Sequence, residues 1–254
     1  MGISSTGEAG ITVVTIDFPP VNGIPVQGWS DLADAVRTAG RDPSTHVVVL
    51  RAAGDRGFCA GVDIKELDRD PGAMVAVNRG CHAAFGAIYD CSVPVIAAVH
   101  GFCLGGGVGI TGNADVVIAA EDATFGLPEV DRGVLGAATH LARLVPQHLL
   151  RAMYYTTETI GAHQLQRYGS VYRVVPRAEL DAAALELAGR IAAKDTRVIR
   201  RAKEAINGID PVDVHRSYRF EQGFTFELAL CQLDAPARPS HPPTRASRPL
   251  AKES

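Results

Sequence analysis

Short runs of apolar, mostly β-branched residues recur along the chain, and each has the length of a buried strand. Longer stretches between them carry apolar residues every three to four positions, the pattern of amphipathic helices. We expect strands at residues 11–16, 46–50, 95–99, 116–119 and 171–175. We expect helices at residues 30–39, 78–89, 149–155, 162–168 and 178–193. Strands that alternate with helices predict an α/β fold.

The pattern becomes mostly helical in the last third of the chain. Two consecutive helices are expected at 195–207 and 211–229, separated at Gly208 and Pro211. The part after residue 230 is rich in proline, and its composition cannot bury a core. We therefore expect a core at 1–190, a C-terminal helical region at 191–230, and a disordered or atypical tail at 231–254.

Composition narrows the functional classes. The chain has 254 residues, 46% of them hydrophobic, and a net charge of −3. This balance offers no basic face for nucleic acid or a membrane surface. No apolar run approaches the ~20 residues that span a bilayer, and the polar N-terminus has no signal-peptide core, so we expect a cytoplasmic protein. The five cysteines form no C-x-x-C pair, which predicts reduced thiols and no metal site.

Three consecutive glycines, Gly105, Gly106 and Gly107, follow a β-branched run and open an expected helix. Glycine inside a helix costs about 1 kcal/mol relative to alanine, so the cluster needs an explanation. Glycines leave backbone N–H groups uncovered, and a helix N-terminus carries unpaired donors and the positive end of the dipole. This segment predicts a seat for an anion or a developing oxyanion.

Two further segments carry candidate chemistry. Residues 57–67 follow an expected strand and place Ala60 and Gly61 at a turn, where a backbone N–H can face a ligand; an ordinary strand-to-helix turn is the alternative. In residues 125–133, Glu129 follows a proline and is a candidate general base or acid. A solvated cluster of charged residues is the alternative there. Asp131, two positions further on, is either a helper of that carboxylate or a helix-capping or salt-bridging residue.

Taken together, these segments resemble the crotonase superfamily, the enoyl-CoA hydratase/isomerase family. The resemblance spans roughly residues 8–230 and rests on the stretches 58–66, 94–107, 113–115 and 125–129. It implies a spiral of ββα units followed by helices that assemble trimers, often hexamers. It also implies that Ala60 and Gly106 form an oxyanion hole for the thioester oxygen of an acyl-CoA. Coenzyme A then belongs to the substrate, and no cofactor is bound permanently.

Family hydratases use two glutamates on either side of the substrate. The resemblance pairs one with Glu129 and the other with Gly109, which has neither an acid nor a base. It therefore implies chemistry with one carboxylate. The implied catalytic residues are Glu129 and Asp131. The implied substrate- and CoA-binding residues are Cys59, Gly61, Asp63, Ile64, Lys65, Gly105, Gly107, Gly109 and His140.

A narrower resemblance concerns an actinobacterial branch that is linked to breakdown of the steroid C and D rings. It rests on residues 20–25, 78–81, 121–141 and 221–228. Members of that branch hydrolyse a ring carbon–carbon bond in a bicyclic keto-acyl-CoA, which suits the missing second glutamate. The alternatives are an enoyl-CoA hydratase or isomerase, and a catalytically silent acyl-CoA-binding protein of the same fold.

Overall fold

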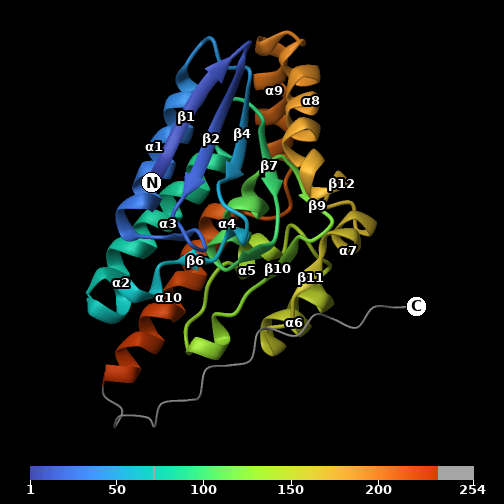
Figure 1. Ribbon diagram of the computed structural model, residues 1–254. Helices are drawn as coiled ribbons and strands as arrows, with labels where there is room; N and C mark the ends of the chain where they lie inside the picture. Colours follow the sequence, from blue (N-terminus) through green and yellow to red (C-terminus); the bar gives the residue numbers. More distant parts are fainter. Residues whose placement is uncertain (71, 234–254) are drawn as a thin grey trace.

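The computed structural model describes residues 1–70 and 72–233. Its largest sheet has six strands in the order β1-β2-β4-β7-β9-β12, antiparallel between β1 and β2 and parallel between the other neighbours. Figure 1 shows this sheet between a helical layer on one side and α8 on the other. The six strands are β1 (Gly2–Glu8), β2 (Ile11–Asp17), β4 (Val47–Ala52), β7 (Val95–Val99), β9 (Val116–Ala120) and β12 (Arg173–Val175).

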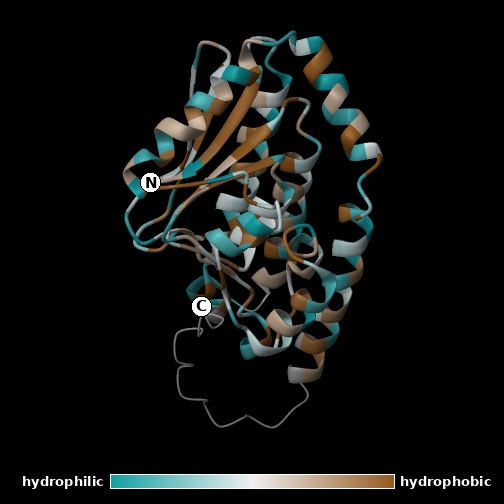
Figure 2. Cartoon of the chain, turned by 90° about the vertical axis from the view of Figure 1, so that its right-hand side faces the viewer, coloured by the Kyte–Doolittle hydropathy of each residue, from teal (hydrophilic) through white to brown (hydrophobic). Residues whose placement is uncertain are grey.

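Both faces of this sheet are buried, which explains why its strands read as continuous apolar runs. In β4, Val48 and Leu50 face the core under α1 and α3, whereas Val47 and Val49 face the core under α8. The hydropathy colouring of Figure 2 shows the strands of this sheet as apolar ribbons. The helices concerned are α1 (Val26–Arg41), α3 (Ala73–Tyr89) and α8 (Leu180–Ala192).

Smaller sheets extend from the carboxyl ends of the main strands. One has the order β11-β10-β8-β5, and the other pairs β3 with β6 in parallel. These strands are β3 (Gly23–Ile24), β5 (Gly57–Cys59), β6 (Gly61–Val62), β8 (Phe102–Leu104), β10 (Thr124–Gly126) and β11 (Ile160–Gly161). Of these strands, β5, β6, β8 and β10 lead into the segments that carry candidate chemistry.

Short helices surround these sheets, and two longer helices follow α8. The short ones are α2 (Ile64–Arg69), α4 (Gly106–Asn113), α5 (Ala138–Leu141), α6 (Gln147–Thr156), α7 (Ala162–Arg167) and the 3-10 turns Val130–Arg132 and Arg177–Glu179. The long ones are α9 (Thr196–Gly208) and α10 (Val214–Leu233). No helix in the described residues is long and apolar enough to cross a membrane.

The α/β class is confirmed, and the expected strands of the main sheet are all present within about two residues. Strand β1 was not expected, because the polar N-terminus has no strand pattern. It pairs with β2 along its whole length while most of its side chains stay exposed. Helix α10 runs to Leu233, three residues past the expected end of the helical region. The rest of the expected tail, residues 234–254, lies outside the described residues.

Candidate active site

A cavity of about 340 Å³ opens where the small sheets, α3 and α10 meet. Its wall is mostly apolar. Charged side chains enter it from the loop after β6 and from the loop after β10. The lining residues come from the loop before β3, residues 60–67, the cavity-facing side of α3, Gly106, residues 128–137 and α10. The site is therefore assembled from segments far apart in the sequence.

The glycine triplet places a backbone donor at the cavity wall. Gly105 has φ +55° and directly precedes α4, which begins at Gly106. The first N–H groups of a helix have no acceptor within it, and the dipole favours negative charge there. Gly61, with φ +87°, lies against this point: a Cβ at Gly61 would be 3.1 Å from the Gly106 nitrogen. The two glycines keep the Gly106 N–H uncovered by side chains.

The second expected donor is already engaged. The Ala60 N–H donates to the carbonyl of Asn22 at 3.2 Å. Asn22 is itself fixed, because its side chain accepts from the Phe18 N–H and donates to the carbonyls of Ala53 and Gly57. A thioester oxygen at this position would therefore share the Ala60 donor with a backbone carbonyl.

Glu129 brings a carboxyl group to the glycine segment. Its Oε1 would lie 2.4 Å from a Cβ at Gly105, and its Oε2 is shut off from solvent with no hydrogen-bond partner among the described residues. Burial raises the pKa of Glu129 to about 8, and the charge of Glu221 adds to this. The residue's own backbone N–H and Arg132 act in the opposite direction. A base with such a pKa is matched to proton transfer near neutral pH.

Glu221 of α10 contacts the segment that joins cavity residues 134–137 to α5. Its carboxylate accepts from the N–H groups of Ala138 and Thr139 at 3.0 and 3.2 Å and from the Tyr154 hydroxyl at 3.0 Å. The same hydroxyl accepts from the Gly136 N–H at 3.2 Å. Glu221 thus caps the N-terminus of α5 and fixes the loop that carries cavity residues 134–137.

The comparisons with known proteins agree with this geometry. A family model described as enoyl-CoA hydratase/isomerase matches residues 6–222. The chain belongs to this family. A solved enoyl-CoA hydratase from Mycobacterium avium subsp. paratuberculosis K-10 superimposes with a TM-score of 0.82 at 28% identity, covering 92% of this chain and 95% of that chain. The expected crotonase-like fold is therefore confirmed.

Two relatives are much more similar in sequence. Both are named (7aS)-7a-methyl-1,5-dioxo-2,3,5,6,7,7a-hexahydro-1H-indene-carboxyl-CoA hydrolase. The protein from Rhodococcus jostii (strain RHA1) is 67% identical over 233 residues, which cover 91% of this chain and 90% of that protein. The protein from Mycobacterium tuberculosis is 63% identical over 229 residues, which cover 89% and 92%.

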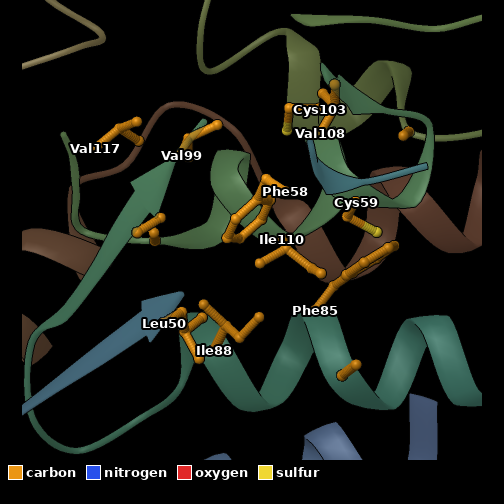
Figure 3. Packing of buried hydrophobic residues seen from close by; sticks show 14 of the residues in the cluster. Leu50, Phe58, Cys59, Phe85, Ile88, Val99, Cys103, Val108, Ile110 and Val117 are labelled. Atoms are coloured by element: carbon orange, nitrogen blue, oxygen red, sulfur yellow. The ribbon is translucent and has the colours of Figure 1, made fainter. Parts of the chain in front are cut away.

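Gly109, which the family resemblance pairs with a second glutamate, packs against an aromatic ring. A Cβ at Gly109 would lie 2.2 Å from the ring of Phe85. Figure 3 shows this ring reaching from α3 toward Cys59 and Ile110. Phe85 is 2% exposed and contacts the Trp29 ring edge-on at 5.5 Å, so it has little room to move. A side chain at position 109 is thus excluded by the packing of this chain.

The structure does not bring Asp131 to the cavity. Its carboxylate accepts from the Thr157 hydroxyl at 2.8 Å, and the residue is exposed on the short 3-10 turn after Glu129. This bond ties the 3-10 turn to the end of α6. Asp131 thus has a structural contact, which is neither a helix cap nor one of the salt bridges in the described residues.

His140 lies one layer behind the cavity. Its Nδ1 is 2.8 Å from the Asn113 amide nitrogen, and burial lowers its pKa to about 3, which keeps the ring neutral. The ring contacts Phe85 and Tyr218 at centroid distances of 4.7 Å, and these two side chains do line the cavity. His140 therefore supports the wall.

The other expected binding residues divide into two groups. Gly61, Asp63, Ile64 and Lys65 line the cavity, and Asp63 also caps α2 by accepting from the Lys65 N–H at 3.0 Å. Cys59, Gly105 and Gly107 lie behind the wall. Burial raises the pKa of the Cys59 thiol to about 12, and a Cβ at Gly107 would meet the Cys59 carbonyl at 2.8 Å. This second group sets the path of the backbone.

Several cavity residues were not expected as site residues, although the stretch 78–81 contributed to the narrower resemblance. Met74, Val77, Asn78, Cys81 and Phe85 form a stripe along α3 with helical spacing. Such a stripe reads as an ordinary core-facing surface. The interruption of the apolar stripe by an asparagine is the signal that could have marked it.

Proposed function

We propose that this protein hydrolyses a ring carbon–carbon bond in a bicyclic, steroid-derived diketo acyl-CoA. The observation that carries the proposal is the buried, unpartnered Glu129 carboxyl against Gly105 at the start of α4, with Phe85 packed against Gly109, where the family resemblance places a second carboxylate. The names of the two relatives above 60% identity support it, because each describes a hydrolase of a dioxo-indene acyl-CoA.

The reaction assigns a role to each group. Glu129 removes a proton from water, whose oxygen attacks a ring ketone. The carbon–carbon bond beside that ketone then breaks, and its electron pair passes to a ring carbon that is conjugated with the thioester. The Gly106 N–H, with the shared Ala60 N–H, stabilises the charge that reaches the thioester oxygen. Protonated Glu129 returns a proton to the conjugated carbanion, and the product keeps its thioester and gains a carboxylate.

The protein environment supports this chemistry. A carboxyl with a pKa of about 8 is a stronger base than an exposed glutamate, so it is better suited to activating water. The apolar wall of the cavity suits a hydrocarbon bicycle. Lys65 at the cavity is the candidate contact for the phosphates of CoA.

The deciding experiment uses purified protein with crotonoyl-CoA and, in parallel, with the bicyclic diketo acyl-CoA in H₂¹⁸O. We expect one ¹⁸O in a new carboxylate from the bicycle and no product from crotonoyl-CoA. Hydration of crotonoyl-CoA without ring opening would refute the hydrolase proposal. It would favour the second candidate, an enoyl-CoA hydratase or isomerase that works with one carboxylate. If Glu129→Ala left every acyl-CoA reaction unchanged, the role of Glu129 would be wrong.

The proposal extends to assembly into trimers or dimers of trimers. Helix α9 exposes large apolar side chains in the isolated chain: Val198 is 63% and Ile206 62% exposed, and Ile209 directly after the helix is 82% exposed. Apolar surface of this kind is typical of protein contacts. Light scattering coupled to size exclusion tests this, and a monomer at micromolar concentration would refute it.

A further inference from the structure

Asn78 interrupts the apolar surface that α3 presents to the cavity. The stripe otherwise consists of Met74, Val77, Cys81 and Phe85. Asparagine is a weak helix former, because its side chain competes for backbone hydrogen bonds. Packing therefore gives no reason for an amide at this position.

The amide of Asn78 lacks a partner. The residue is 9% exposed, and its Nδ2 is shut off from solvent with no hydrogen-bond partner among the described residues. Its backbone carbonyl accepts from the Gln222 amide at 2.8 Å, so α10 packs directly against this turn of α3. A buried donor without an acceptor destabilises the unliganded protein, and a ligand atom that accepts from it would remove that penalty.

The chemistry of the proposed substrate supplies such an acceptor. Two ketone oxygens are the polar atoms of its bicycle, and both only accept hydrogen bonds. The neighbouring Thr225 hydroxyl is engaged, because it donates to the Leu135 carbonyl at 2.8 Å. The Asn78 amide turns on its last side-chain torsion, which has a broad energy profile, so its NH₂ group can face the cavity.

We propose that Asn78 binds substrate by donating a hydrogen bond from its side-chain amide to a ketone oxygen of the bicyclic acyl group. This inference rests on the proposed function and adds the group that selects keto-acyl over plain hydrocarbon thioesters. A site built around a hydrogen bond rejects ligands that lack the matching atom, because its polar group is then left unpaired.

The test compares wild type with Asn78→Leu, which keeps the volume and removes the amide. We expect kcat/KM for the diketo thioester to fall about 10- to 100-fold. Inhibition by ketone-free cyclohexanecarboxyl-CoA should stay within about twofold, and the melting temperature should hold or rise because an unpaired buried amide is gone. Arg79→Gln, on the exposed side of the same helix, is the matched control.

The other outcomes contradict either the role of Asn78 or the proposed function. Equal kcat/KM for wild type and Asn78→Leu overturns the inference and leaves the proposed function standing. An equal loss of affinity for the ketone-free thioester, or a lower melting temperature, makes the role structural and also overturns it. Asn78→Asp keeps the shape of the side chain and replaces the donor with an acceptor. Its kcat/KM for the diketo thioester should fall at least as much. If wild type does not open the ring, the proposed function fails, and Kd values of the diketo thioester for wild type and Asn78→Leu then decide the inference.

Discussion

Glu129→Gln should make the protein more stable while removing its activity. Glutamine keeps the shape of the side chain and cannot ionise. In the folded protein the Glu129 carboxyl holds its proton up to pH about 8, whereas its ordinary pKa of 4.5 applies in the unfolded chain. Between these values the folded state binds one more proton, so the stability of wild type falls as the pH rises. The glutamine variant lacks this dependence.

The magnitude follows from the size of the pKa shift. Each pKa unit corresponds to about 1.4 kcal/mol, and pH 7 lies roughly two and a half units above the ordinary pKa of the carboxyl. The variant should then be roughly 3 kcal/mol more stable than wild type at pH 7, and less than about 1 kcal/mol more stable at pH 5. For a chain of this size, 1 kcal/mol moves the melting temperature about 2–4 °C, so the gap at pH 7 is about 6–12 °C.

Calorimetric melting at pH 5, 6, 7 and 8 measures this difference, with ring opening assayed on the same samples. Wild-type kcat/KM should rise about tenfold per pH unit below pH 8, because the base acts only when ionised. Glu121→Gln removes one carboxylate from an exposed position and controls for the change in net charge.

A gap that does not change between pH 5 and 8 would refute the reasoning, because the carboxyl would then not be what titrates. A variant that melts below wild type at pH 7 would show that the ionised carboxylate has partners in the fold. Ring opening by the glutamine variant would remove Glu129 from the chemistry altogether.

Three further predictions concern its neighbours. Gly109→Glu alone should destabilise the protein by several kcal/mol because it collides with Phe85, and Gly109→Glu with Phe85→Ala should recover part of that loss; equal melting temperatures would contradict the packing argument. Arg132→Gln should move the alkaline rise of kcat/KM to higher pH, since Arg132 lowers the pKa of Glu129, and an unmoved profile would exclude this coupling. Glu221→Gln should lower thermal stability by about 1–3 kcal/mol and raise KM, because the α5 cap and the adjoining cavity wall loosen; unchanged values would show that the clamp is dispensable.

The central sheet was predictable because its signal is local. Val47 to Leu50 alternate between two buried faces, so an apolar run of strand length marks β4 without knowledge of its neighbours. Strands β5 and β6 have three and two residues, too short for any periodicity to show. Strand β1 was missed because its side chains are mostly exposed and its order comes from pairing with β2.

The residues of the candidate site also fall into two groups, those marked by their own segment and those that depend on distant contacts. Gly106 and Glu129 stand in short segments whose residue types indicate chemistry by themselves, so the sequence marked them as candidates. The amide of Asn78 and the clamp of Glu221 acquire meaning only when α10 packs against α3 and α5. Those contacts join residues more than 80 positions apart, for example Ala138 with Glu221, and no local pattern encodes them.

The position of α10 also sets the order in which the site can form during synthesis. The six strands of the central sheet have all been made once the ribosome has passed residue 175, and domains begin to fold as they emerge. Tyr218, Glu221 and Thr225 leave the ribosome much later, so until then the cavity lacks one wall and the cap of α5 lacks its carboxylate. A nascent chain can thus form the sheet before it can bind a substrate, which delays acyl-CoA binding until α10 has been made.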